Sequence, residues 1–133
     1  MKVYLDTNVV VSAVAARGLC ADLLHAILAE HVLVLGETVL TELRRVLRRK
    51  VGVTRETVQE LEAFLRRYAT VVPAARGSIR KGLDAADAAV LAEAATAAAD
   101  VLVTGDRDLL AVVDSPVKIA TPRGLWELLR RAT

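Results

Sequence analysis

The sequence predicts an α/β fold in which helices cover both faces of a parallel central sheet. Short apolar strands alternate with helices along the whole chain, which is the pattern of repeated strand–helix units. The runs at 32–35 and 101–103 are apolar at every position instead of alternating, so each of these strands must be buried on both faces. The length of 133 residues fits one domain, and we expect residues 1–133 to form it.

Composition narrows the class of protein further. Hydrophobic residues make up 54% of the chain and aromatic residues only 3%, so alanine, valine and leucine must build the core. No apolar run reaches the roughly 18 residues that a membrane span needs, and Asp6 interrupts any signal-peptide core, so no membrane association is expected. The single cysteine, Cys20, allows no internal disulfide and predicts a cytoplasmic protein. A net charge of +2 does not by itself indicate a nucleic-acid-binding protein.

The first three elements follow from local signals. Residues 2–5 form a β-rich run that stops at Asp6. Asn8 is the expected N-cap of a helix over 9–16, because its side chain can accept hydrogen bonds from the first helical amides. A second helix over 21–30 carries leucine and isoleucine at helical spacing.

The middle of the chain repeats the alternation. A buried strand over 32–35 is followed by a helix over 38–50, whose apolar face opposes an arginine-rich one. A further helix is predicted over 54–68, and a short strand over 69–72 ends at Pro73.

The last third begins with a loop over 73–83, which is rich in glycine and serine. An alanine-rich helix then starts at Asp84 and runs through Ala99. The remaining predicted elements are a strand over 101–103, a short helix over 107–113, a strand over 117–120 and a final helix that begins at Pro122.

Four carboxylates from four separate elements are predicted to meet at the carboxyl-end edge of the sheet, where open α/β sheets build their sites. Asp6 ends the first strand, and Asp106 follows the strand over 101–103. Glu42 lies in the first turn of the helix after the second strand, and Asp87 lies in the first turn of the alanine-rich helix. Two further acids stand beside them, Asp84 and Asp108.

Such a cluster suits a hard divalent cation. Crowded carboxylates repel one another and raise their own pKa values unless a cation compensates them. Mg²⁺ and Mn²⁺ prefer oxygen ligands and keep water that can serve as a nucleophile on a phosphodiester. Thiolate and imidazole ligands at metal spacing are lacking, which argues against zinc.

Each acid also has a plain structural explanation. Asp84 and Asp106 are suitable helix N-caps, and Asp87 favours the helix dipole from the first turn. Glu42 has Arg45 three residues on, an ordinary surface ion pair. Asp6 has no obvious capping role beside Asn8, and the coincidence of all these acids at one edge favours a site.

The ordered set of motifs resembles the PIN domain family, specifically the bacterial and archaeal toxin components related to VapC. The similarity covers essentially the whole chain; DTN alone is a weak signal, and the ordered set is a strong one. The matching segments are LDTNVVVSA (5–13), TELRRVL (41–47), DAADAAVLAEA (84–94), LVTGDRDLL (102–110) and the closing IATPRGLWELL (119–129).

The resemblance implies a three-layer α/β/α sandwich and an endoribonuclease that depends on one or two Mg²⁺ or Mn²⁺ ions. By the same resemblance the catalytic and metal-binding acids are Asp6, Glu42, Asp87 and Asp106. Related toxins vary in which acid after the strand faces the metal, so Asp108 stays an alternative to Asp106.

The resemblance also implies supporting residues and partners. Thr7 or Asn8 would orient Asp6 or its water, and Thr104 would contact the acid cluster. Many relatives are homodimers that a cognate antitoxin holds inactive. We therefore expect an RNA substrate, an antitoxin protein and a homodimer.

An RNA phosphate must overcome repulsion from the acids, so a positive rim is expected. Arg107, Arg45 and Lys81 are the predicted substrate-binding residues, with Arg107 favoured because it adjoins Asp106. Arg44 and Arg48 are expected to be ordinary solvated side chains of the arginine-rich helix.

Two other function classes remain on the sequence alone. A phosphatase with Asp6 as covalent nucleophile would want a second aspartate two residues on, where Asn8 stands. A non-catalytic RNA- or protein-binding module would use the acids only to hold a structural ion. The sequence contains no nucleophile elbow, phosphate-binding loop or dinucleotide fingerprint.

Overall fold

The computed structural model describes residues 1–131 and contains a five-stranded sheet in the order β3-β2-β1-β4-β5. Every neighbouring pair of strands is parallel, as the apolar strands predicted. The strands are β1 (Lys2–Leu5), β2 (Val32–Gly36), β3 (Thr70–Val72), β4 (Val101–Val103) and β5 (Lys118–Ala120).

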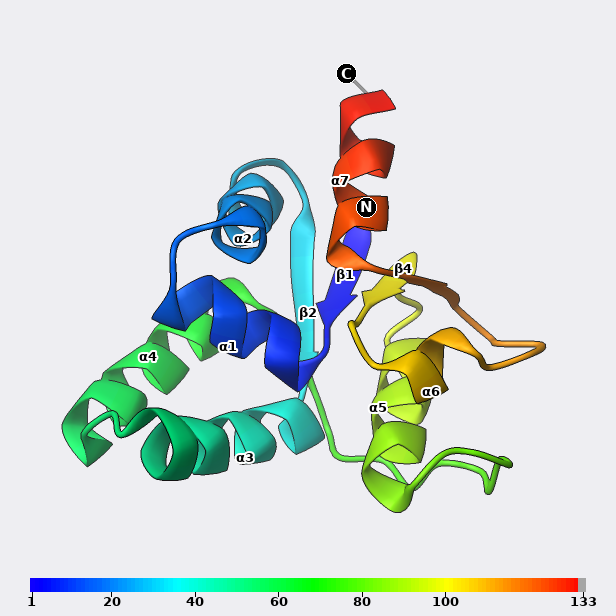
Figure 1. Cartoon of the computed structure of the whole chain (residues 1–133), viewed down its shortest axis with the longest axis horizontal. Helices are drawn as coiled ribbons and strands as arrows, with labels where there is room; N and C mark the ends of the chain where they lie inside the picture. The colour runs from blue at the N-terminus through cyan, green and yellow to red at the C-terminus, as the bar shows by residue number, and fades with distance from the viewer. Residues whose placement is uncertain (132–133) are drawn as a thin grey trace.

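Helices cover the sheet on both sides, which confirms the three-layer α/β/α arrangement. In Figure 1, α1 to α4 lie on one side of β2, and α5 and α6 lie on the other. The helices are α1 (Thr7–Ala15), α2 (Leu19–Glu30), α3 (Glu37–Val46), the π-helical turn η1 (Leu47–Val51), α4 (Arg55–Tyr68), α5 (Ala85–Thr96), α6 (Arg107–Leu110) and α7 (Pro122–Arg131). Within residues 1–131 no single helix is long and apolar enough to cross a membrane; α1 and α2 pass that test only as a pair, bent by 99°.

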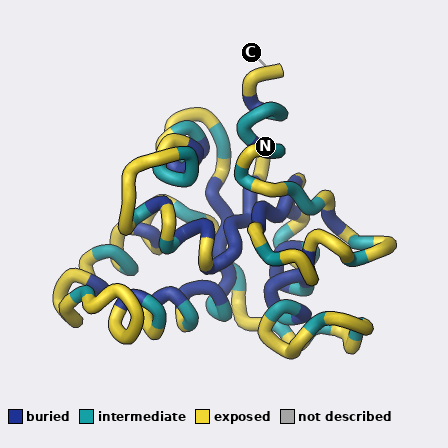
Figure 2. Tube along the Cα trace, viewed as in Figure 1, coloured by how far each residue is buried: buried dark blue, intermediate teal, exposed yellow. Residues whose placement is uncertain are grey.

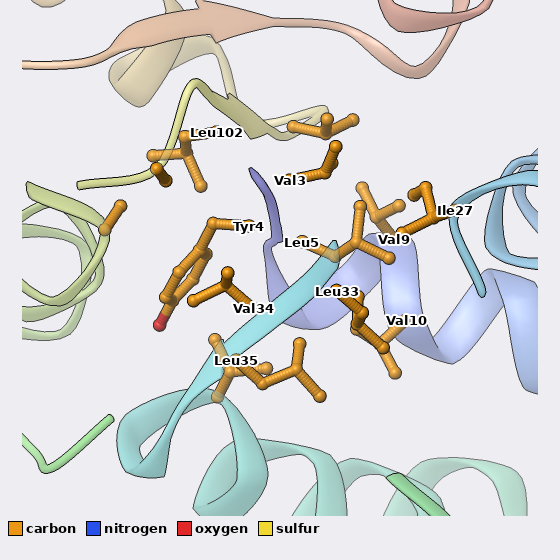
Figure 3. Close-up of a cluster of buried hydrophobic side chains, with 14 of the residues drawn as sticks. Val3, Tyr4, Leu5, Val9, Val10, Ile27, Leu33, Val34, Leu35 and Leu102 are labelled. Atoms are coloured by element: carbon orange, nitrogen blue, oxygen red, sulfur yellow. The ribbon is translucent and has the colours of Figure 1, made fainter. Parts of the chain in front are cut away.

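The core surrounds strands β1 and β2, which Figure 2 shows as buried along most of their length. Alternate residues of β1 point to opposite faces of the sheet. Leu5 packs among Val9, Ile27 and Leu33 on one face, and the ring of Tyr4 lies on the other (Figure 3). Valine, leucine and alanine dominate this core, as the composition predicted.

The start of the first helix differs from the prediction. Asp6, not Asn8, is the N-cap of α1, and the helix begins directly at Thr7. The Asp6 carbonyl accepts the Val9 and Val10 amides, and its side chain accepts the Thr7 amide. The N-cap assignment to Asn8 was wrong because no loop separates β1 from α1; Asn8 lies exposed in the first helical turn.

Other boundaries shift in ways that affect the site. The helix expected over 38–50 is divided into α3 and the wider turn η1. Because α3 already begins at Glu37, Glu42 lies in its second turn rather than its first. Helix α5 ends at Thr96 instead of Ala99, and α6 ends at Leu110.

Candidate metal centre

The carboxyl ends of β1 and β4 bring their first polar residues into direct contact. Leu5 and Val103 are paired in register, so Asp6 and Thr104 follow at the same edge of the sheet. The Thr104 hydroxyl donates to Asp6 Oδ2 at 2.7 Å, and the Asp6 amide donates to the Val103 carbonyl at 3.0 Å. The parallel pairing therefore fixes the Asp6 carboxylate in position.

Asp6 is a buried carboxylate with both oxygens held. It is only 7% exposed, and its Oδ1 accepts the Thr7 amide at 2.8 Å. Burial raises the pKa of Asp6, the hydrogen bonds from Thr104 and Thr7 lower it, and the negative charge of Asp106 raises it again. Together these effects leave the pKa of Asp6 above its usual range.

Glu42 reaches the same centre from α3. The Thr7 hydroxyl donates to Glu42 Oε2 at 3.2 Å, so Thr7 links Asp6 and Glu42. Burial raises the Glu42 pKa, as do the charges of Asp6 and Asp84, whereas the Thr7 hydrogen bond and Arg45 lower it. Within residues 1–131, Arg45 makes no direct ion pair with Glu42, so the ordinary surface pair does not explain this glutamate.

Helix α5 contributes one cap and one half-buried acid. Asp84 is the N-cap of α5, and its Oδ1 accepts the Asp87 amide at 2.8 Å, so the capping explanation holds for Asp84. The pKa of Asp87 is raised to about 7 by burial and by the charges of four other carboxylates. Those carboxylates are, in decreasing effect, Asp106, Asp84, Asp6 and Glu42.

Asp106 and Asp108 stand at the start of α6. Asp106 Oδ1 caps this short helix by accepting the Asp108 amide at 2.8 Å, and the Asp106 amide donates to the Thr104 hydroxyl at 3.0 Å. Carboxylate oxygens of Asp87, Asp106 and Asp108 all lie within 4.8 Å of one another. Asp6 and Glu42 do not belong to this group. Asp106 and Asp108, the two alternatives for the acid after β4, both belong to it.

The residues present fit a hard divalent cation. The group consists of carboxylates alone, with no histidine or cysteine among them. Oxygens bound to one Mg²⁺ lie within about 4.2 Å of each other, twice the usual bond length of about 2.1 Å, so a small inward movement of the side chains suffices. The raised pKa of Asp87 reflects its burial first and then the repulsion among the carboxylates, which such an ion would relieve.

The predicted positive residues are exposed around this centre. Arg107 follows Asp106 directly, and Arg45 is close enough to Glu42 to lower its pKa. Lys81 and Asp108 line the same hollow, of about 290 Å³. The side chains expected to be solvated lie elsewhere: Arg44 pairs with Glu62 at 3.1 Å, and Arg48 donates to the Val53 carbonyl at 3.2 Å.

One buried acid escaped the sequence reasoning. Glu93 on α5 is 0% exposed and accepts the Thr38 amide at 3.0 Å. The signal that could have found it is its position among apolar residues in the second half of α5, where a buried glutamate needs partners.

The chain is similar to known proteins in sequence pattern and in fold. The model of the PIN domain matches residues 2–108. No curated protein is similar enough in sequence to count as a relative.

Three solved structures share the fold. VapBC2 from Rickettsia felis, bound to a DNA fragment from its promoter, has a TM-score of 0.65 at 15% identity, covering 91% of this chain and 98% of that one. FitAB bound to the IR36 DNA fragment has a TM-score of 0.62 at 18% identity, covering 90% and 94%. FitAcB from Neisseria gonorrhoeae has a TM-score of 0.60 at 18% identity, covering 91% and 98%.

Proposed function

The chain belongs to the PIN domain family, and we propose that it is a Mg²⁺- or Mn²⁺-dependent endoribonuclease that hydrolyses RNA phosphodiester bonds. The observation that carries the proposal is the convergence of charge on Asp87. Burial raises the pKa of Asp87, and the carboxylates after β1, on α3 and at the starts of α5 and α6 raise it further. That arrangement is costly for the protein alone and favourable for binding a divalent ion.

Asp6, Glu42, Asp87 and Asp106 are the proposed ligands and catalytic acids, with Asp108 as the alternative to Asp106. The hydroxyls of Thr7 and Thr104 hold Glu42 and Asp6 in fixed orientations, so the centre is arranged before the ion arrives. A bound divalent ion would polarise the phosphate and lower the pKa of the attacking water.

Substrate binding rests on the positive rim. Arg107, Arg45 and Lys81 are exposed beside acids of the centre and would neutralise the phosphates on either side of the scissile bond. These contacts carry no base code, so they would bind RNA of any sequence.

The biological role that we propose is the toxin of a type II toxin–antitoxin pair. The likeness to VapBC2 and FitAB, together with the VapC-like motifs, supports a cognate antitoxin as partner. The homodimer that we propose rests on the VapC-like motifs alone. A cytoplasmic location would follow from that role.

A second candidate is a non-catalytic RNA- or protein-binding PIN module with a structural ion. The observation in its favour is that Asp84 and Asp106 both cap helices, so part of the acid cluster already has a structural task. The two candidates differ in whether the protein cleaves RNA: the nuclease does, and the binding module does not.

The test is cleavage of a panel of structured and single-stranded RNAs in Mg²⁺, Mn²⁺ or EDTA. Wild type and Asp87→Asn are purified identically and assayed in parallel. Metal-dependent cutting by the wild type alone supports the nuclease. Equal cutting by both proteins indicates a contaminating nuclease and refutes the assigned role of Asp87. Metal binding without turnover on any RNA favours the binding module.

A further inference from the structure

An arginine-lined groove lies between α3–η1 and α4. Its volume is about 540 Å³. The charged residues that line it are Arg44, Arg45, Arg48, Arg49, Arg55 and Glu62.

The groove keeps a free positive charge. Its one acidic lining residue, Glu62, already pairs with Arg44 at 3.1 Å and with Arg66 at 2.9 Å. In the part of the chain that the structure describes, Arg49 and Arg55 have no ion-pair partner. Their guanidinium groups are therefore available to an anion from outside the chain.

The backbone of the groove is also unusual. Arg48 and Arg49 belong to η1, a π-helical turn that ends at Gly52, whose φ is 79°. Turns of this kind are rare and often occur at functional sites.

We propose that this groove binds the phosphate backbone of single-stranded RNA and continues the substrate path away from the acid centre. Arg45 joins the two regions, since it lines the groove and also lowers the pKa of Glu42 one turn earlier on α3. The inference rests on the proposed function for the identity of the substrate. RNA is favoured over an acidic protein segment because Arg45 links the groove to Glu42 of the acid centre.

Fluorescence anisotropy of a labelled single-stranded RNA in EDTA, over a range of salt concentrations, tests the groove without cleavage. Arg49→Ala/Arg55→Ala should weaken binding and reduce the slope of log affinity against log salt by about 1.4, about 0.7 for each lost phosphate contact. The matched control is Arg17→Ala/Arg123→Ala, which removes two exposed arginines outside the groove. Loss of Arg55 should not unfold the protein, because a cation at the start of α4 opposes the helix dipole.

The outcomes separate the groove from the proposed activity. An unchanged affinity and salt slope in the groove variant, or an equal change in the control variant, overturns the proposal and leaves the groove to another acidic partner. Wild-type protein that binds RNA through the groove without ever cleaving it refutes the nuclease and supports the groove. Cleavage of a dinucleotide, too short to reach the groove, should be the same in wild type and groove variant.

The first turn of α3 lacks a capping side chain at its N-cap position. Gly36 occupies the N-cap position and has no side chain to offer. Glu93 on α5 supplies the missing oxygen, because its Oε1 accepts the amide of Thr38, the second residue of α3. An N-cap side chain normally serves that same amide.

The space for this arrangement depends on Gly36. A Cβ atom at Gly36 would collide with the Glu93 carboxylate and the Tyr4 hydroxyl. Glu93 Oε2 and the Tyr4 hydroxyl have no hydrogen-bond partner within residues 1–131, so burying these groups costs free energy. An apolar side chain on α5 and a serine at the N-cap would avoid that cost.

We infer that Glu93 is a positioning residue for the metal centre, because it ties α3 to α5. Helix α3 carries Glu42 four residues after Thr38, and α5 carries Asp87 six residues before Glu93. At 1.5 Å per residue, the hydrogen bond between Thr38 and Glu93 lies about 6 Å along α3 from Glu42 and about 9 Å along α5 from Asp87. A shift between α3 and α5 would therefore change the separation of the acids.

The test compares Glu93→Ala with Gly36→Ser/Glu93→Ala by Mn²⁺ titration and thermal melting. Both variants are made in a Tyr4→Phe background, which removes the hydroxyl that a Cβ at position 36 would meet. The added serine can then cap α3 locally, in the space that Glu93 vacates, but it cannot tie α3 to α5. We expect the double variant to recover most of the stability lost in Glu93→Ala while its Mn²⁺ affinity stays about tenfold below wild type. Glu93→Gln keeps the side-chain shape and an oxygen that can accept the Thr38 amide, so it should keep most of the Mn²⁺ affinity.

Recovery of Mn²⁺ affinity together with stability would reduce Glu93 to a simple cap and overturn the inference. A loss of Mn²⁺ affinity in Glu93→Gln as large as that in Glu93→Ala would do the same, because glutamine keeps the hydrogen bond to Thr38. Wild-type protein that binds no Mn²⁺ refutes the metal centre itself, which distinguishes that failure from a failure of the positioning role.

Discussion

Replacing Asp87 with asparagine should stabilise the metal-free protein above neutral pH. The folded-state pKa of Asp87 is about 7 against 3.8 for the unperturbed group, because burial and four neighbouring carboxylates disfavour the charge. Since the folded pKa is raised, the folded state holds a proton that the unfolded state has already released. Stability is therefore greatest below the unfolded pKa and is lost as the pH rises toward about 7.

The size of the effect follows from the shift. About 3 pKa units correspond to about 4 kcal/mol at about 1.36 kcal/mol per unit. Asp87 is half-buried, so solvent screening reduces the net effect to about 1 to 2 kcal/mol. Asparagine cannot ionise, so Asp87→Asn should equal wild type near pH 4 and exceed it by that amount at pH 8.

Urea unfolding in EDTA at a series of pH values between about 4 and 8 measures this difference. Asp114→Asn, at an exposed residue between α6 and β5, is the matched control and should leave the pH profile unchanged. Added Mn²⁺ should reverse the order at pH 8, because saturation at about 100 times Kd stabilises wild type by about 2.7 kcal/mol. An Asp87→Asn protein less stable than wild type at pH 8 without metal would refute the repulsion argument.

Three further changes test the supporting contacts. Thr104→Val should destabilise the protein by about 1 to 3 kcal/mol in urea melts, because the buried Asp6 oxygen and the Asp106 amide both lose their partner, whereas Thr104→Ser should keep most of the stability. Asp84→Ala should cost about 1 kcal/mol through loss of the α5 cap, and Asp84→Asn, which still caps, should cost much less; equal losses would contradict the capping role. Arg107→Ala should raise KM for RNA and lower the salt slope of binding by about 0.7, and an unchanged KM would remove Arg107 from the substrate rim.

Much of the fold could be predicted from the sequence because it depends on local patterns. Consecutive apolar residues in the strands over 32–35 and 101–103 led to a parallel, doubly covered sheet, and the structure has one. The same reasoning predicts the edge of the sheet at which the acids lie, because Asp6 and Asp106 come after parallel strands.

What could not be predicted depends on contacts between distant parts of the chain. The role of Asp6 as the N-cap of α1 requires knowing that no loop follows β1, and the sequence alone favoured Asn8 as the cap. The burial of Glu93 depends on the missing side chain of Gly36, which no local pattern on α5 reveals. The turn η1 likewise interrupts a segment whose sequence reads as one continuous helix.

The most direct test of the metal centre is anomalous diffraction from crystals grown or soaked with Mn²⁺. The account predicts a peak at the carboxyl-end edge of the sheet, about 2.1 Å from carboxylate oxygens of Asp87 and Asp106, with Asp6 or Glu42 as a further ligand. Such a map would also decide between Asp106 and Asp108. Full Mn²⁺ occupancy elsewhere, with no peak beside Asp87, would contradict the central claim.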